Sequence, residues 1–421
     1  MDYQRAARYA LGWMKEAVAW RGVAAVATIF IAAGVVFNLE HGTRWPLYGL
    51  FGALWTSAAW SCWRSRGVAE PAGAPLQWRR LAPSAALLFV LAMLLPVVLN
   101  RPPAGVSDLS DEINVVERTL PSMALATISP GHMATFHVEH GQYRPLKFAL
   151  IWLAGRTHTF RFAMLFGHAI TALLVLILID LWTADLVVAT MVGVGFLLHP
   201  IGLYELLFNW DIQYLWAAPC FLLSMVAVDR RRDVAAVVAF LAACFFQESW
   251  APAVLLLLWM VRAERRRMIP FVVAAAFAGG VLLYADLRYA KRVGMVTTPN
   301  WRRALINVVF EPYWAFHVPW VFKYRSAVLL AALGSAVVPL RIMWAESRAA
   351  ALWIAVPLAI APGLMFFEMM PDWSHARLAY GTCALLAVAA GVMLAHRRSW
   401  AAIAVVGWLA LTWYNQGIKL A

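Results

Sequence analysis

Residues 161–181 read RFAMLFGHAITALLVLILIDL, with charged side chains only at Arg161 and Asp180. A helix rises about 1.5 Å per residue, so a run of this length covers the roughly 30 Å of a bilayer's hydrocarbon core. Similar apolar runs recur along nearly the whole chain, near residues 21–37, 46–62, 81–99, 161–181, 185–199, 212–228, 234–246, 250–261, 269–285, 326–340, 351–367, 378–395 and 400–415. We therefore predict an all-α integral membrane protein with about 13 transmembrane helices.

The composition agrees with this class. Of the 421 residues, 63% are hydrophobic and only 14% are charged, whereas a soluble domain carries roughly 25% charged residues. The net charge of +13 fits arginines that fix topology against anionic membrane lipids, so we expect membrane lipids and no nucleic acid as partners. The four cysteines lie in or beside apolar segments without a CxxC pair, and we interpret them as small buried side chains.

Basic clusters fall on alternate connections between the predicted spans. The positive-inside rule places such clusters in the cytoplasm, which predicts a multi-pass protein of the cell (inner) membrane with a cytoplasmic N-terminus. Two long polar segments, 101–160 and 286–325, then face outward. We divide the chain into an N-terminal transmembrane hairpin with its linker, residues 1–80, and a main transmembrane domain, residues 81–421.

The first outer segment, 101–160, contains the adjacent carboxylates Asp111 and Glu112. Its apolar spacing predicts amphipathic helices that lie on the membrane surface. A carboxylate near the interface could act as a general base toward an acceptor hydroxyl, and either residue of this pair could do so. Asp108 and Glu117 are interpreted as solvated loop charges.

The second outer segment, 286–325, is basic and includes Arg302 and Arg303. Arginine can bind phosphate through two parallel hydrogen bonds, which favours a phosphate-binding surface. Attraction to anionic lipid headgroups is the alternative for these cations. Several tryptophan and tyrosine residues in the segment indicate a second interfacial helix.

Further polar residues lie at the predicted outer ends of spans, namely His199, Glu205, Asp211 and Arg377. Their location on the same side as Asp111 favours an active site on the outer face. Residues 229–262 have basic residues at both ends and two short apolar halves, which predicts a helical hairpin whose tip, at Glu248, stops inside the protein. A glutamate at membrane depth needs a wet cavity or a partner, so Glu248 is either functional or held in a structural salt bridge.

Five short strings resemble those of one family, the GT-C superfamily of polytopic glycosyltransferases. The resemblance is strongest to bacterial relatives of the transmembrane O-mannosyltransferases that carry tetratricopeptide repeats, and it covers roughly residue 81 to the C-terminus. The strings are Tyr143-Arg144-Pro145-Leu146, FRFAMLFGH at 160–168, Leu198-His199-Pro200 with Glu205, Phe246-Gln247-Glu248, and Ala376-Arg377-Leu378-Ala379-Tyr380. Asp111-Glu112 stands where the family usually has two aspartates, and no tetratricopeptide repeats follow.

The resemblance implies a GT-C-like fold and an inverting transfer of a sugar from a polyprenyl-phosphate-linked donor to a glycan, lipid or protein acceptor on the outer (periplasmic) face. Asp111 or Glu112 would be the base, and the donor phosphate would be bound by Arg377, Arg144, Arg302 and Arg303. Residues expected to position the acceptor or substrate are Glu205, Glu248, His199, His168, Asp211 and Tyr143. A divalent metal on carboxylates, Mg²⁺ or Mn²⁺, is left open, and no other cofactor is expected.

Three alternatives remain open from the sequence. A lipid-linked polysaccharide polymerase or ligase would use similar donors, but a long late outer loop is typical of that class. A transporter or flippase would carry charges within its spans and related halves. A purely structural membrane protein would leave the outward polar residues unexplained.

Overall fold

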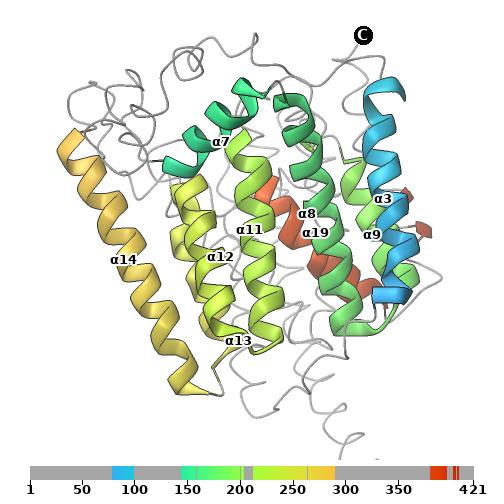
Figure 1. Cartoon of the computed structure of the whole chain (residues 1–421). Coiled ribbons are helices and arrows are strands. Elements are labelled where there is room, and N and C mark those ends of the chain that lie inside the picture. Colours follow the sequence, from blue (N-terminus) through green and yellow to red (C-terminus); the bar gives the residue numbers. More distant parts are fainter. Residues whose placement is uncertain are drawn as a thin grey trace, which may run out of the picture. The chain divides into compact units, whose positions relative to one another are not determined.

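In the computed structural model, the described residues are 78–98, 144–157, 159–199, 201–202, 212–262, 264–289, 380–395, 402–403 and 405–406. They all belong to one of two compact units of the chain, the unit formed by Val68–Pro319 and Ala351–Ala421. The described part is helical and contains no strand, which confirms the all-α prediction there. Its helices are α3 (Trp78–Val98), α7 (Pro145–Arg156), α8 (Phe160–Thr183), α9 (Leu186–Leu197), α11 (Ile212–Asp229), α12 (Asp233–Phe246), η2 (Glu248–Ala253), α13 (Val254–Met260), α14 (Arg265–Tyr289) and α19 (Tyr380–Ala395) (Figure 1).

Three of these helices, α3, α8 and α11, are long and apolar enough to cross a membrane. This supports the membrane character of the chain. The predicted spans near 21–37, 46–62, 326–340 and 351–367, and most of 400–415, lie outside the described residues. Helix α3 begins at Trp78, so the domain boundary predicted after residue 80 falls within its first turn.

Helix α8 lies at the centre of the described bundle and contacts α3, α9, α11 and α19. Its sequence is apolar on all sides, and a helix of that kind is stable only when it is surrounded. The helix ends at Ala184, which adopts a left-handed conformation (φ 56°) and donates its N–H to the Asp180 carbonyl. Asp185 then caps α9 by accepting a hydrogen bond from the Val188 N–H.

Helices α8 and α11 begin at the same end of the bundle. The indole Nε1 of Trp216, in the second turn of α11, donates to the carbonyl of Ala163, in the first turn of α8, at 3.1 Å. The opposite end, which we call the turn end, therefore holds both the α8–α9 and the α11–α12 connections. The other end, beside α7, is called the α7 end (Figure 1).

The described arginine clusters gather at the turn end. Arg80 of α3 donates to the Asp180 side chain and to the Ala184 carbonyl, at 3.1 and 2.9 Å, and so lies beside the α8–α9 turn. The clusters at residues 230–232 and 265–267 meet through the ion pairs described below. The three clusters assigned to one side of the membrane from sequence are therefore together at one end, and which side that end faces stays a prediction.

The segment before α8 differs from its prediction. Residues 101–160 were expected to form a polar loop with surface helices, but the last part of this segment is the apolar helix α7. Phe148, Ile151 and Ala154 of α7 are buried, and α7 contacts α8, α11 and α12. It starts at Pro145, a residue favoured at the first helical position because its missing N–H would have no partner there.

The hairpin predicted between the two basic turns is present as α12, η2 and α13. Helix α12 has 14 residues, about 21 Å, which is shorter than a bilayer's hydrocarbon core. It ends where Gln247 adopts an extended backbone (φ −150°, ψ 115°), and the chain turns back through the 3₁₀ helix η2. Glu248 therefore lies at the tip of the hairpin, at the α7 end.

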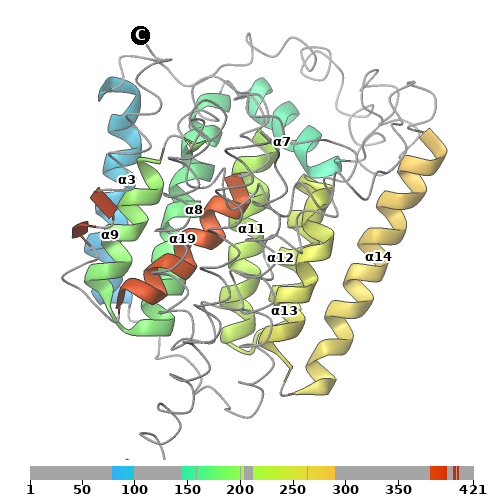
Figure 2. The ribbon, with the colours of Figure 1, turned by 180° about the vertical axis from the view of Figure 1, so that it is seen from behind.

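Helix α19 packs against α8, α9 and α11 and completes the described core (Figure 2). Nearly all of its side chains are buried. The close packing depends on two glycines: a Cβ at Gly391 would lie 2.2 Å from Ile179, and one at Gly381 would lie 2.2 Å from Trp250. Helix α14, at the end of the hairpin, extends to Tyr289 and so includes the first residues of the second outer segment.

Candidate functional site

A buried ion pair joins Arg144 and Glu248 at the α7 end. The guanidinium Nε donates to Oε2 at 2.7 Å, and Nη2 donates to Oε1 at 2.6 Å. The pair is therefore bidentate, the strongest common geometry between arginine and a carboxylate. The two side chains are only 11% and 21% exposed, so solvent screens the interaction weakly.

The local sequence explains how each partner is held. Arg144 directly precedes Pro145, so its backbone is fixed at the start of α7, and the carbonyl of Arg144 accepts the N–H of Phe148. Glu248 follows the extended Gln247 and opens η2. The pair thus joins two segments that are 104 positions apart.

Lys147 adds a second cation to this pair. It lies on the first turn of α7, is 3% exposed, and interacts electrostatically with Glu248. Arg144, Lys147 and Glu248 form what we call the outer-motif cluster. Sequence reasoning missed Lys147, although a lysine in an otherwise apolar helix directly after the Tyr143–Leu146 string was a usable signal.

Gln247 lies beside the cluster and is almost fully buried. Within the described part of the chain its side-chain oxygen Oε1 has no hydrogen-bond partner. Buried polar atoms of this kind are rare and call for an explanation. A buried amide oxygen at the hairpin tip with no partner among the described residues is a suitable acceptor for a hydroxyl of a bound substrate.

A second cluster surrounds His168 in α8. Its Nε2 lies 2.9 Å from the Leu197 carbonyl, which can only accept, so this nitrogen carries the proton. Its Nδ1 therefore accepts from the Tyr380 hydroxyl at 2.8 Å. Both ring nitrogens are engaged inside the protein, so any effect of His168 on substrate would act through the placement of helices. Its predicted role in substrate positioning stays a prediction.

His199 lies in the same region, at the end of α9. Its Nδ1 accepts the backbone N–H of Ile201 at 3.3 Å and lies 3.6 Å from the sulfur of Cys383. The side chain of His199 is completely buried. Gly202 packs directly on His168, since a Cβ there would lie 2.2 Å from the imidazole ring. We call His168, His199, Tyr380 and Cys383 the histidine cluster.

The two clusters are connected through Trp250. This residue lies two positions after Glu248 and packs against Gly381, the neighbour of Tyr380. It also stacks near Phe221 of α11, with ring centroids 4.7 Å apart. Parts of all five strings singled out in the sequence therefore meet in one region of the bundle, although they come from residues 144 to 380.

Most of the predicted site residues lie outside the described residues. These are Asp111, Glu112, Tyr143, Glu205, Asp211, Arg302, Arg303 and Arg377. The base, most of the phosphate-binding residues and several positioning residues therefore stay predictions. Of the predicted site residues that are described, Arg144 and Glu248 are in direct contact, and His168 and His199 belong to the histidine cluster.

The described residues contain no group of three or more His, Cys, Asp or Glu side chains that could hold a metal ion. Both oxygens of Glu248 accept hydrogen bonds from Arg144, which suits a carboxylate that fixes a cation in place. The three described cysteines, Cys220, Cys244 and Cys383, are free thiols.

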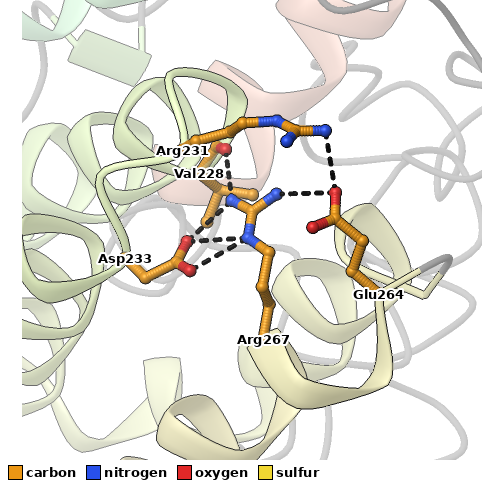
Figure 3. Close-up of polar contacts among 5 residues, drawn as sticks. All are labelled: Val228, Arg231, Asp233, Glu264 and Arg267. Atoms are coloured by element: carbon orange, nitrogen blue, oxygen red, sulfur yellow. Dashed lines mark hydrogen bonds and ion pairs between the residues drawn. The ribbon is translucent and has the colours of Figure 1, made fainter.

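A different set of charges links the α11–α12 and α13–α14 connections at the turn end (Figure 3). Arg267 donates to both oxygens of Asp233, at 2.7 to 3.1 Å, and to the Val228 carbonyl at 2.9 Å. Glu264 accepts from Arg231 at 2.9 Å and from Arg267 at 3.5 Å. The hydrogen bonds with Asp233 raise the pKa of Arg267 above its usual value, so this cation stays charged. We call these residues the turn network.

We compared the chain with known proteins by family, by sequence and by structure. No family model, no curated protein and no solved structure matches it.

Proposed function

We propose that the protein is a membrane glycosyltransferase of the GT-C type, which moves a sugar from a polyprenyl-phosphate-linked donor to an acceptor. The reaction would take place at the α7 end, on the outer face of the membrane. The configuration at the sugar would invert, and a carboxylate of the Asp111-Glu112 pair would act as general base.

The observation that carries this proposal is the outer-motif cluster. Charges at membrane depth are costly and mark functional sites by default. The cluster brings two cations, Arg144 and Lys147, to the hairpin tip, and such cations suit the phosphate of an anionic ligand. The phosphate of a lipid-linked sugar donor is such a ligand, and its isoprenoid chain suits a site that is surrounded by apolar helices.

The meeting of the five strings supports the same proposal. Each string alone is short, and chance resemblance would not require the strings to be neighbours in space. The Arg144–Glu248 pair joins the first and fourth strings, while the contacts of His168 with Leu197 and Tyr380 join the second with the region of the third and with the fifth.

The chemistry requires two groups of residues. The base removes the proton of the acceptor hydroxyl as its oxygen attacks the anomeric carbon from the face opposite the phosphate. The bond between the anomeric carbon and the phosphate oxygen breaks, and the electron pair leaves with the polyprenyl phosphate. Cations that are already in place stabilise the charge on that oxygen, a role we assign to Arg144 and Lys147 together with Arg377. Glu248 orients Arg144.

The base is tested by Asp111→Asn and Glu112→Gln, each assayed in membranes with a panel of radiolabelled polyprenyl-phosphate sugars. We expect one of the two variants to lose about 100-fold or more of the transfer rate, in the range typical of general bases. Glu117→Gln is the matched control and should transfer normally. Normal transfer by both Asp111→Asn and Glu112→Gln would show that the base assignment is wrong.

A further inference from the structure

Among the described residues, the turn end carries more arginines than carboxylates. The α11–α12 and α13–α14 connections, with the first turns of α12 and α14, contain seven arginines and two acidic residues. Asp233 and Glu264 are engaged within the turn network. Arg262 stacks over Trp259, 4.4 Å from the ring centroid. Arg232, Arg265 and Arg266 are exposed, and among the described residues they make no ion pair or side-chain hydrogen bond.

Two of these arginines lie where a positive charge destabilises the helix that contains them. Arg265 and Arg266 lie in the first turn of α14, which contains no acidic residue. The partial positive charge of a helix N-terminus disfavours cations in this turn. Arg267, the third of the run, is turned inward to Asp233 (Figure 3), which shows that the three consecutive arginines are not equivalent.

An apolar stripe continues from these arginines along the outside of α14. Ile269, Val272, Val273, Phe277 and Tyr284 are each at least 50% exposed. With Arg265 they follow spacings of three, four and seven residues, so they share one face of the helix. From Arg265 to Tyr284 the face extends for about 28 Å, close to the thickness of a bilayer's hydrocarbon core.

We propose that Arg232, Arg265 and Arg266 bind the headgroup of an anionic phospholipid whose acyl chains lie along the exposed face of α14. The arginines supply charge and hydrogen-bond donors for the phosphate, and the stripe supplies the apolar surface for the chains. The combination selects a lipid over a soluble phosphate, because only the lipid occupies both parts. This site is separate from the outer-motif cluster, which lies at the other end of the bundle.

The test is a titration of the delipidated full chain with phosphatidylglycerol, followed by native mass spectrometry. We expect the double variant Arg265→Gln/Arg266→Gln to weaken the tightest binding event by an order of magnitude or more, at about fivefold per arginine. The single variant Arg232→Gln, on the other turn, should weaken it by about fivefold. Arg161→Gln, an exposed arginine at the start of α8 and at the opposite end of the bundle, is the matched control and should leave this event unchanged.

Three results would overturn the proposal. One is undiminished phosphatidylglycerol binding by the double variant while its thermal unfolding matches that of the parent chain. Another is equally tight binding of phosphatidylcholine, because the arginines would then not select the headgroup charge. The third is displacement of phosphatidylglycerol by glycerol 3-phosphate at equal concentration, since the stripe would then contribute nothing.

Discussion

The Arg144–Glu248 pair and the Arg267–Asp233 pair use the same chemistry in two different settings. Each is a bidentate contact between arginine and a carboxylate, and each connects segments far apart in the sequence. The first lies at the tip of a hairpin in an apolar surrounding, where the buried Lys147 also acts on Glu248 and the buried Gln247 precedes Glu248 in the chain. The second lies at the turn end, where Arg267 and Asp233 are 16% and 28% exposed and where Arg267 also donates to Glu264 and to the Val228 carbonyl.

We interpret the Arg144–Glu248 pair as part of the proposed functional site and the Arg267–Asp233 pair as a structural connection between helices. A bundle does not need a buried ion pair for stability, since packed apolar residues of similar volume often serve as well. A charged pair between the connections of neighbouring helices, by contrast, fixes how those helices are joined. The proposed function therefore belongs to the pair at the α7 end, whereas the turn network connects helices.

The largest effect on stability is expected from Glu248→Gln. Removing one partner of a buried ion pair leaves the other charge uncompensated and costs about 3–5 kcal/mol. The free energy of unfolding in detergent or nanodiscs measures this. Arg144→Met/Glu248→Met, which removes both charges, should recover most of the loss. A loss below about 1 kcal/mol for the single variant would mean that water solvates the Arg144–Glu248 pair. Its setting would then not differ from that of the Arg267–Asp233 pair.

The second-largest effect on stability is expected at the contact of Trp250 with Gly381, which links the outer-motif cluster to the histidine cluster. In Gly381→Ala the new Cβ would lie 2.2 Å from Trp250, so the helices must shift. Overpacking of this kind costs about 1–3 kcal/mol, measured by thermal unfolding. Gly279→Ala in α14 is the matched control: nothing lies within 4 Å of its added Cβ, and alanine is the better helix former there. Equal stability of the two variants would contradict the described packing of η2 on α19.

In the turn network, Arg267→Gln should cost about 1–2 kcal/mol, since charge-assisted hydrogen bonds to Asp233 and to the Val228 carbonyl are lost. Chemical denaturation of the purified protein measures the change. Sugar transfer per folded molecule should be retained, because the network is at the end opposite the proposed site. A complete loss of transfer in folded protein would place function at the turn end instead.

The smallest effect is expected from Arg231→Gln. Its side chain is 67% exposed, and exposed ion pairs contribute at most about 1 kcal/mol. The difference from the parent chain should disappear when unfolding is repeated at high salt, because salt screens exposed charges. A larger, salt-independent loss would indicate that the turn network is more buried than its exposure implies.

The sequence predicted the helices where apolar runs are long. Spans expected at 161–181 and 212–228 correspond to α8 (Phe160–Thr183) and α11 (Ile212–Asp229). The hairpin with Glu248 at its tip also followed from charge placement, because basic residues at both ends require the chain to return. Helix α7 was missed because it lies directly after a polar segment and is too short to meet the length rule for a span.

The partners within the site could not be derived in the same way. Periodicity and length describe one segment at a time, whereas the Arg144–Glu248 contact depends on how α7 and the hairpin pack together. The sequence left Glu248 as either a functional or a salt-bridged residue, and the structure shows the salt bridge to Arg144 together with an electrostatic interaction with Lys147. The contact of His168 with Tyr380, 212 positions away, likewise depends on the tertiary arrangement.

The most direct measurement compares sugar transfer by Glu248→Gln and Asp233→Asn in membranes, each normalised to the amount of folded protein. Both substitutions remove the charge from the carboxylate of a bidentate arginine pair, one at each end of the bundle. We predict that Glu248→Gln abolishes transfer from a polyprenyl-phosphate sugar and that Asp233→Asn retains it. Equal transfer by the two variants, or loss only in Asp233→Asn, would contradict the assignment of function to the α7 end.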